Sequence, residues 1–316
     1  MARRWGMNTL RQAVNEYLAL RQAMGFKLHE ESRLLPRFID FLEDQDEAII
    51  TTDLAVRWAT QCRTVQPAEW ARRLRFVRVF ARYRSATDPR TQIPPTGLLP
   101  YRARRAEPYI YNDNEINQLL QAAGQLYSPK GLRAHTYVTA LGLLAVTGMR
   151  ISELVALDNE DVDLAHGHLT IRDAKFGKSR WLPLHSTTQQ ALQRYVQRRD
   201  QQYPIPRSSG FFVSEQGTRL TTCTVRATFV RLSRQIGLRG FTDSHGPRLH
   251  DFRHRFAVQT LLRWYQEGAD VEQHLPELST YLGHVKVSDT YWYLSATPEL
   301  LQLALQRSER GDTHDR

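Results

Sequence analysis

Four short strings between residues 147 and 293 hold side chains that could act on a phosphate group. Arginine is planar, permanently charged and able to bond two phosphate oxygens at once. A tyrosine hydroxyl can attack phosphorus, and histidine or lysine can move protons. The side chains concerned are Arg150, Lys175, His250, Arg253, His284 and Tyr293. Taken singly, each also has an ordinary structural explanation: a salt bridge, a solvated turn, a helix cap or a core aromatic.

Together these side chains fit the cleavage of a phosphodiester without water or metal. Conserving the energy of the broken bond requires a covalent intermediate on a side-chain nucleophile. The transition state places extra charge on the non-bridging oxygens, which Arg150 and Arg253 can clamp. His250 and His284 can donate hydrogen bonds to the same phosphate or handle the proton of the nucleophile.

The order and flanks of the four strings resemble the tyrosine recombinase, or phage-type integrase, superfamily. The strings read TGMRISEL, KFGKSR, HDFRH and LGH, the last followed by YWY, and the resemblance covers about residues 110–296. It implies site-specific DNA recombination, as integration, excision or transposition, through a 3′-phosphotyrosyl intermediate and a free 5′-hydroxyl. It also implies no cofactor, and four protomers acting on two duplexes through a Holliday junction. The long link Trp264–Leu278 suggests a transposon-borne branch, such as the recombinase-in-trio type, with sister recombinases as partners.

The resemblance implies that Lys175 is the general acid for the leaving 5′ oxygen. Lys178 is the rival lysine in the same hairpin, and Arg180 is expected to bond phosphate or protein. Glu153 lies three residues after Arg150, on the same helix face, where it can support that arginine.

Two tyrosines compete as the nucleophile. Tyr293 lies nine residues after His284, which is the family spacing, whereas Tyr291 lies seven after it. If 288–294 is helical, the two side chains point about 200° apart, so only one can face the phosphate. We expect Tyr293 to be the nucleophile and Tyr291 to pack.

The sequence alone leaves other function classes open. A type IB topoisomerase shares the chemistry, and a regulator that has lost catalysis would keep the DNA contacts. A third alternative is a basic structural nucleic-acid binder, in which the order of the candidate catalytic residues along the chain would be a coincidence. The chain has 11 histidines, but no His/Cys/carboxylate set has convincing metal-ligand spacing.

Composition and charge favour a folded protein with a polyanionic partner. The chain has 316 residues, 41% of them hydrophobic, and a formal net charge of +10. Residues 57–105 hold 12 basic and 2 acidic side chains, so the excess is concentrated. The apolar run 140–146 is too short to span a bilayer. The two cysteines form neither a disulfide framework nor a metal cluster, which fits a cytoplasmic, reducing setting.

The first part of the chain reads as four helices, at about 8–24, 31–42, after Thr51 or Thr52, and 68–84. The last of these carries an apolar stripe formed by Trp70, Leu74, Val77 and Ala81. Its flanks carry four candidate DNA-binding arginines: Arg72, Arg75, Arg78 and Arg82.

Residues 87–108 are rich in proline and read as a rigid, semi-extended linker. Its Arg102, Arg104 and Arg105 are further candidates for DNA backbone contact, together with Lys178 and Arg180 of the hairpin. We therefore expect a helical core-binding domain over 1–106 and a catalytic domain over 107–316.

The second part reads as mainly helical with a small sheet. Asn112 and Glu115 form a capping box, and strands 168–173 and 179–184 read as a β-hairpin. Further helices are predicted at about 134–147, 150–156, 187–200, 221–236, 250–266, 277–283 and 288–294. An amphipathic tail helix at 296–307 is expected to dock on a neighbouring protomer, with packing in cis as the alternative. The predicted fold is thus mainly α with a small antiparallel sheet, arranged as a two-domain DNA clamp.

Overall fold

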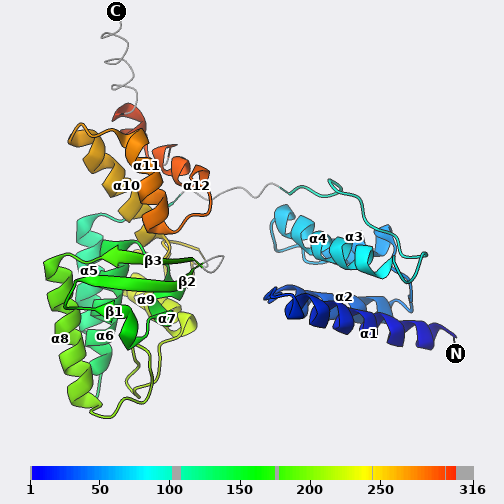
Figure 1. The fold of residues 1–316 in the computed structure, drawn as a ribbon, viewed down its shortest axis with the longest axis horizontal. Helices are drawn as coiled ribbons and strands as arrows, with labels where there is room; N and C mark the ends of the chain where they lie inside the picture. Colours follow the sequence, from blue (N-terminus) through cyan, green and yellow to red (C-terminus); the bar gives the residue numbers. More distant parts are fainter. Residues whose placement is uncertain (1, 102–107, 175–177, 244, 296, 304–316) are drawn as a thin grey trace, which may run out of the picture. The chain divides into compact units, whose positions relative to one another are not determined.

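The chain divides into two compact units, Met1–Ala106 and Glu107–Arg316, and each is described by itself. The computed structural model describes residues 2–101, 108–174, 178–243, 245–295 and 297–303 (Figure 1). The two units bury separate hydrophobic cores. No helix in these ranges is long and apolar enough to cross a membrane.

Within residues 2–101, four helices build the first unit: α1 (Ala2–Ala23), α2 (Glu31–Asp44), α3 (Thr52–Thr60) and α4 (Pro67–Arg84). Helices α1 and α2 form one layer, and α3 and α4 form the other (Figure 1). The Thr51 hydroxyl accepts a hydrogen bond from the Leu54 amide at 3.2 Å, which confirms Thr51 as the N-cap of α3. Phe38 and Trp58 meet at the centre of the core with ring centroids 5.2 Å apart.

The proline-rich segment packs on the first unit instead of leaving it at once. The Gln92 amide donates to the Ile50 carbonyl at 2.8 Å, and Arg78 donates to the Pro94 and Pro95 carbonyls at 2.6 and 2.7 Å. Residues 88–99 are therefore part of the surface of this unit, whereas the sequence predicts a rigid, semi-extended linker from about residue 87. The physical reason is that proline carbonyls have no helix or sheet partner, so an arginine from α4 satisfies them.

The described elements of the second unit are mainly helical. They run in the order α5 (Asp113–Gly124), α6 (Leu132–Thr147), α7 (Ile151–Ala156), η1 (Asn159–Asp161), β1 (Val162–Asp163), β2 (His168–Ala174), β3 (Lys178–Pro183), α8 (Ser186–Gln202), α9 (Thr222–Gln235), α10 (Asp251–Gln266), α11 (Val271–Leu282), α12 (Ser288–Tyr291) and η2 (Trp292–Ser295). Asn112 and Glu115 form the predicted capping box of α5. The helix predicted over 277–283 begins earlier, at Val271, because the Asp270 side chain caps it.

The three strands form one antiparallel sheet in the order β1-β2-β3. Leu169 pairs with Leu182 and Ile171 with Arg180, which confirms the predicted hairpin. Leu169, Ile171 and Leu182 point into the core, and α11 contacts β3. The predicted fold class, mainly α with a small antiparallel sheet, is confirmed.

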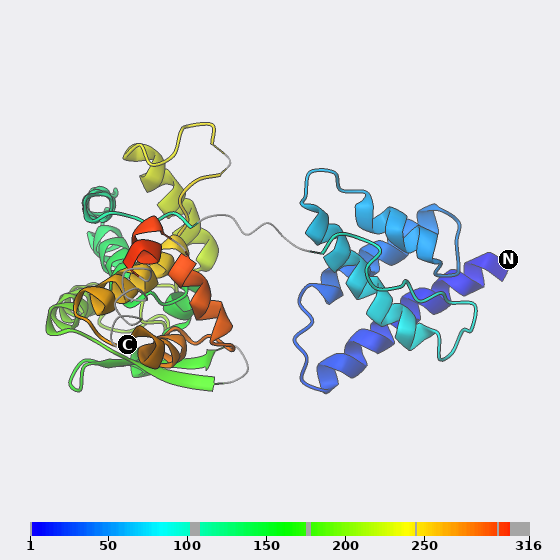
Figure 2. The ribbon, with the colours of Figure 1, turned by 90° about the horizontal axis from the view of Figure 1, so that it is seen from above.

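A separate apolar cluster lies at the end of the second unit where α10, α11 and α12 gather (Figures 1 and 2). It includes Leu261, Leu275, Tyr293 and Leu300, all buried. Residues 298–303 are helical, and Leu300 packs against its own domain, whereas Leu301 is 46% exposed. The rest of the predicted tail helix lies outside the described residues.

Candidate active site

Gly148 shapes the turn that presents Arg150. Its φ is +61°, a left-handed conformation that favours glycine, and an added Cβ would meet the Phe256 ring at 2.8 Å. The turn ends α6 and places Arg150 at the start of α7. Glu153 then accepts hydrogen bonds from the backbone amide of Arg150 at 2.9 Å and from its Nη1 at 2.7 Å.

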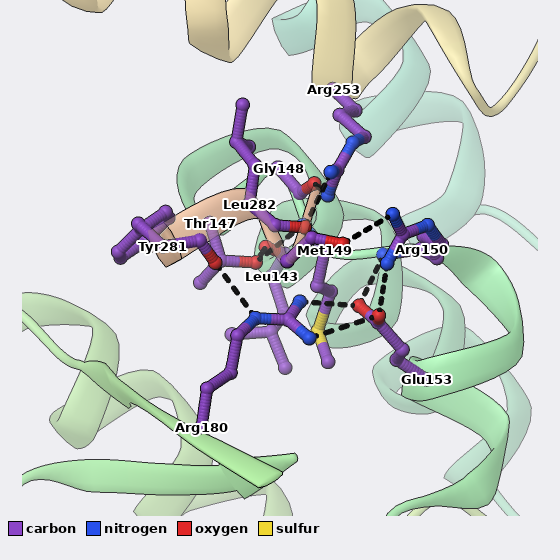
Figure 3. Close-up of polar contacts among 11 residues, drawn as sticks. Leu143, Thr147, Gly148, Met149, Arg150, Glu153, Arg180, Arg253, Tyr281 and Leu282 are labelled. Atoms are coloured by element: carbon purple, nitrogen blue, oxygen red, sulfur yellow. Dashed lines mark hydrogen bonds and ion pairs between the residues drawn. The ribbon is translucent and has the colours of Figure 1, made fainter. Parts of the chain in front are cut away.

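Arg253 crosses the core of the site with only 1% of its surface exposed. Its Nη1 donates to the Gly148 carbonyl at 3.0 Å, and its Nη2 donates to the Leu282 carbonyl (Figure 3). Burial, and then repulsion from Arg150, lowers the pKa of Arg253 to about 10. The side chain remains charged near neutral pH, so the site concentrates positive charge.

The Leu-Gly-His turn joins the two arginines. Gly283 ends α11 with φ +66°, and its carbonyl accepts from Nη2 of Arg150 at 3.0 Å. Arg253 donates to the preceding carbonyl, that of Leu282. The two guanidinium groups, which come from different strings of the sequence, therefore bond the same turn. The turn thereby places His284 beside the two arginines.

His250 and His284 are both held in the neutral form. Desolvation, and then repulsion from Arg253 and Arg248, lowers the pKa of His250 to about 4. Burial, and then repulsion from Arg253 and Arg150, lowers the pKa of His284 to about 4. The two imidazoles can therefore accept a proton or donate one N–H hydrogen bond each near neutral pH.

Tyr293 is buried beside the histidines, with 2% of its surface exposed. Its ring lies 6.1 Å from that of His284, with an interplanar angle of 17°, and 5.5 Å from that of His254. Tyr291 is 49% exposed, so the prediction that it packs is wrong. The chain passes from α12 into the 3-10 turn η2 at Trp292, and within this segment Tyr293 is the buried tyrosine and Tyr291 the exposed one.

Two residues of the site were missed by the sequence analysis. His254 is buried one helical turn after His250, with their rings 4.7 Å apart, and the i,i+4 spacing could have revealed it. Thr290 is buried, and its hydroxyl lies 2.7 Å from Nδ1 of His284. This contact occupies one imidazole nitrogen and leaves Nε2 as the nitrogen available to a substrate.

The lysines of the hairpin are only partly described. Lys175 lies outside the described residues, and Lys178 is described only as the first residue of β3. Arg180 is directed at protein: its Nε donates to the Tyr281 carbonyl at 2.7 Å, and its Nη2 to Glu153 at 2.8 Å. A side chain with 9% of its surface exposed and bonded in this way is a poor DNA contact, so of the two partners expected from the sequence, phosphate and protein, the structure shows protein.

The basic face of α4 is less uniform than the sequence suggests. Arg72 is paired with Glu30 and with Glu69, and Arg78 holds the proline-rich segment. Within the described ranges, Arg75 and Arg82 are exposed and have no side-chain hydrogen bond or ion pair. Arg102, Arg104 and Arg105 lie outside the described residues. Among the side chains that the structure describes, no three His, Cys, Asp or Glu groups gather as metal ligands.

Because the pKa of His284 is lowered in the folded chain, the free energy of unfolding should depend on pH through this residue. An unfolded chain binds a proton at His284 near pH 6.5, whereas the folded chain binds it only near 4. As the pH falls from 6.5 towards 4, the unfolded chain takes up this proton and the folded chain does not. The contribution of neutral His284 to the free energy of unfolding is therefore full above pH 6.5 and is lost towards pH 4, at no more than about 1.4 kcal/mol per pH unit. We expect a flatter fall of the unfolding midpoint in His284→Asn than in the wild type, measured by thermal unfolding across this range. Parallel curves for the two proteins would contradict the assignment.

Comparison with known proteins shows the family to which the chain belongs. The model of the phage integrase family matches residues 110–299. The chain is 52% identical over 308 residues to y4rB of Sinorhizobium fredii, named as an integrase/recombinase, covering 96% of this chain and 98% of that protein. It is 30% identical over 278 residues to the tyrosine recombinase XerC of Pseudomonas entomophila, covering 86% of each. The solved Tn1549 transposon integrase in complex with transposon right end DNA has the same fold, with TM-score 0.64 at 16% identity over 94% of this chain and 98% of that one. The resemblance drawn from the four strings is confirmed, and the chain belongs to the phage integrase family, the tyrosine recombinases, as an enzyme of site-specific recombination that cuts and rejoins DNA.

Proposed function

We propose that Tyr293 is the nucleophile, that Arg150 and Arg253 clamp the scissile phosphate, and that His250 and His284 assist it. The observation that carries this proposal is the convergence of three strings on one turn. Arg253 donates to the Leu282 carbonyl and Arg150 to the Gly283 carbonyl, and the Tyr293 ring stacks near the imidazole of His284, the next residue.

In the proposed reaction, the Tyr293 hydroxyl attacks phosphorus and the bond to the 5′ oxygen breaks. The phosphate becomes a 3′-phosphotyrosyl ester, and Lys175 donates a proton to the departing 5′ oxygen, which leaves as a free 5′-hydroxyl. Neutral His250 or His284 accepts the tyrosine proton. A 5′-hydroxyl from the partner duplex then attacks the ester and restores the tyrosine, so no bond energy is lost.

The buried position of Tyr293 requires a movement before cleavage. With 2% of its surface exposed, its hydroxyl reaches a phosphodiester only if residues 288–295 shift away from His254. The 3-10 geometry of η2 suits such a shift because 3-10 turns are short and weakly hydrogen-bonded.

The first unit is proposed as the core-binding domain and the second as the catalytic domain. Arg75 and Arg82, exposed on α4, are the described side chains best placed to contact DNA phosphates, with Arg102, Arg104 and Arg105 added from the sequence. Arg72 and Arg78 shape this face through their contacts with protein.

The finer biological role is also proposed. Four protomers act on two duplexes, with the tail beyond residue 303 docking on a neighbour and Leu300 anchoring its start in cis. A transposon-borne element is the proposed setting, in the bacterial cytoplasm at the nucleoid, with sister recombinases as further partners. The likeness to the fold of the Tn1549 transposon integrase supports the transposon-borne part of this proposal.

A nicked DNA site and a pair of complete sites test the proposed function. The nicked site should trap a covalent protein–DNA adduct, because the released strand end diffuses away before rejoining. Two complete sites should exchange their flanking DNA. Adduct without exchange would instead indicate a topoisomerase, and no adduct on a verified site would indicate a DNA-binding regulator.

A further inference from the structure

The carboxylate of Glu153 lies between two guanidinium groups. Its Oε1 accepts from Nη1 of Arg150 at 2.7 Å and from Nη1 of Arg180 at 3.1 Å, and its Oε2 accepts from Nη2 of Arg180 at 2.8 Å (Figure 3). The Glu153 side chain is 8% exposed, so these contacts are nearly dry. Burial alone would raise the pKa of Glu153, but hydrogen bonding from Arg180 and the charges of both arginines bring it below its usual value.

Arg180 makes two of the three side-chain hydrogen bonds to this carboxylate, and the backbone amide of Arg150 adds a further bond to Oε2 at 2.9 Å. The two amino groups of Arg180 grip both oxygens of Glu153 in a fork, and its Nε donates to the Tyr281 carbonyl at 2.7 Å. An added Cβ on Gly283 would meet its Nη1 at 2.8 Å, so the Leu-Gly-His turn closes directly over this guanidinium. Arg180 thus ties strand β3 to the turn before His284 and to the carboxylate below Arg150.

The sharing of Glu153 controls how Arg150 is held. A lone carboxylate beside an arginine favours a two-bond fork that would occupy one whole edge of the guanidinium. Because Arg180 already takes both oxygens, Arg150 makes one side-chain bond to Glu153 and directs its Nη2 to the Gly283 carbonyl. The Arg150 side chain remains 28% exposed, and the three groups together carry a net charge of +1.

We propose that Arg180 is a positioning residue that acts through Glu153 to keep Arg150 oriented and available for the scissile phosphate. This inference rests on the proposed function of Arg150. In this proposal the two arginines have different roles: Arg150, at the start of α7, contacts the phosphate, and Arg180, on β3, does not contact DNA. Loss of Arg180 frees Glu153 to pair fully with Arg150 and draws that arginine away from the phosphate.

The test measures adduct formation on a nicked site by the full chain. We expect Arg180→Gln to slow cleavage by about tenfold to a hundredfold, the range seen when a partner that orients a contacting residue is lost. DNA affinity should stay within about twofold of the wild type, since Arg180 contributes to cleavage and not to binding. Arg172→Gln is the matched control: it lies on β2, is 52% exposed and pairs with Asp161, and it should cleave at the wild-type rate.

The double variant Glu153→Gln with Arg180→Gln keeps the net charge of the cluster and removes the buried ion pair. If Arg180 acts through Glu153, adding Arg180→Gln to Glu153→Gln should cost much less than it costs in the wild type. Equal costs in the two backgrounds would overturn the proposal, and this comparison holds even if Arg180→Gln alone folds poorly.

A DNA site with sulfur in place of the bridging 5′ oxygen separates two routes of action. A thiolate leaves without a proton, so this substrate should restore Lys175→Ala but not Arg180→Gln. Restoration of Arg180→Gln would show that Arg180 acts through the general acid and would overturn our assignment to Arg150. Absence of any adduct with the wild-type chain would instead overturn the proposed function, so the two failures are distinguishable.

Discussion

Tyr293→Phe is expected to abolish the covalent adduct on a nicked DNA site, whereas Tyr291→Phe is expected to keep it. The two variants remove the same atom from side chains two positions apart, so they are matched. Tyr293 lies against His284 and His254, with its ring centroid 6.1 Å and 5.5 Å from theirs, while Tyr291 is 49% exposed. Without the hydroxyl, no phosphotyrosyl bond can form, so the loss should be complete.

The measurement is a denaturing gel of protein incubated with labelled nicked DNA, alongside a binding assay for each variant. Both variants should bind the site as the wild type does, because neither hydroxyl is proposed to contribute to affinity. An adduct that persists in Tyr293→Phe and disappears in Tyr291→Phe would reverse the assignment. Such a result would mean that segment 288–295 rearranges far enough on DNA to exchange the two side chains.

Arg150→Gln is expected to give the next largest loss, about a hundredfold to a thousandfold in the cleavage rate. Arg150 is 28% exposed and anchored by Glu153 and Gly283, so its guanidinium can contact a phosphate with little rearrangement. Arg150→Lys should recover little of the activity, because an ammonium cannot make the paired bonds to two oxygens. Single-turnover cleavage at saturating protein measures the effect apart from binding.

Arg263→Gln provides the control for Arg150. Arg263 is an exposed arginine on α10 of the same unit, so the variant removes one positive charge away from the converging strings. Equal losses in the two variants would mean that net charge, and not the clamp geometry, accounts for the effect. The buried Arg253 is less suitable for this comparison, since its bonds to Gly148 and Leu282 also hold the fold together.

Local sequence patterns predicted most elements of the fold. Apolar periodicity and caps such as Thr51 and Asn112 located the helices, because a helix start depends on a few neighbouring residues. The hairpin was predicted from alternation around a glycine turn. The packing of the proline-rich segment on the first unit was not predicted, since it depends on Arg78, which lies 16 residues before Pro94.

The sequence by itself determined the chemistry of this protein: the order of its four strings identified the family and the residue types needed to cut DNA. Only the tertiary structure decided which partners those residues contact. Arg180 and Arg150 are both arginines in strings that bear on phosphate, yet one is 9% exposed against Glu153 and the other 28%. This difference arises from contacts between segments up to 133 residues apart, such as Arg150 with Gly283, which no local pattern encodes.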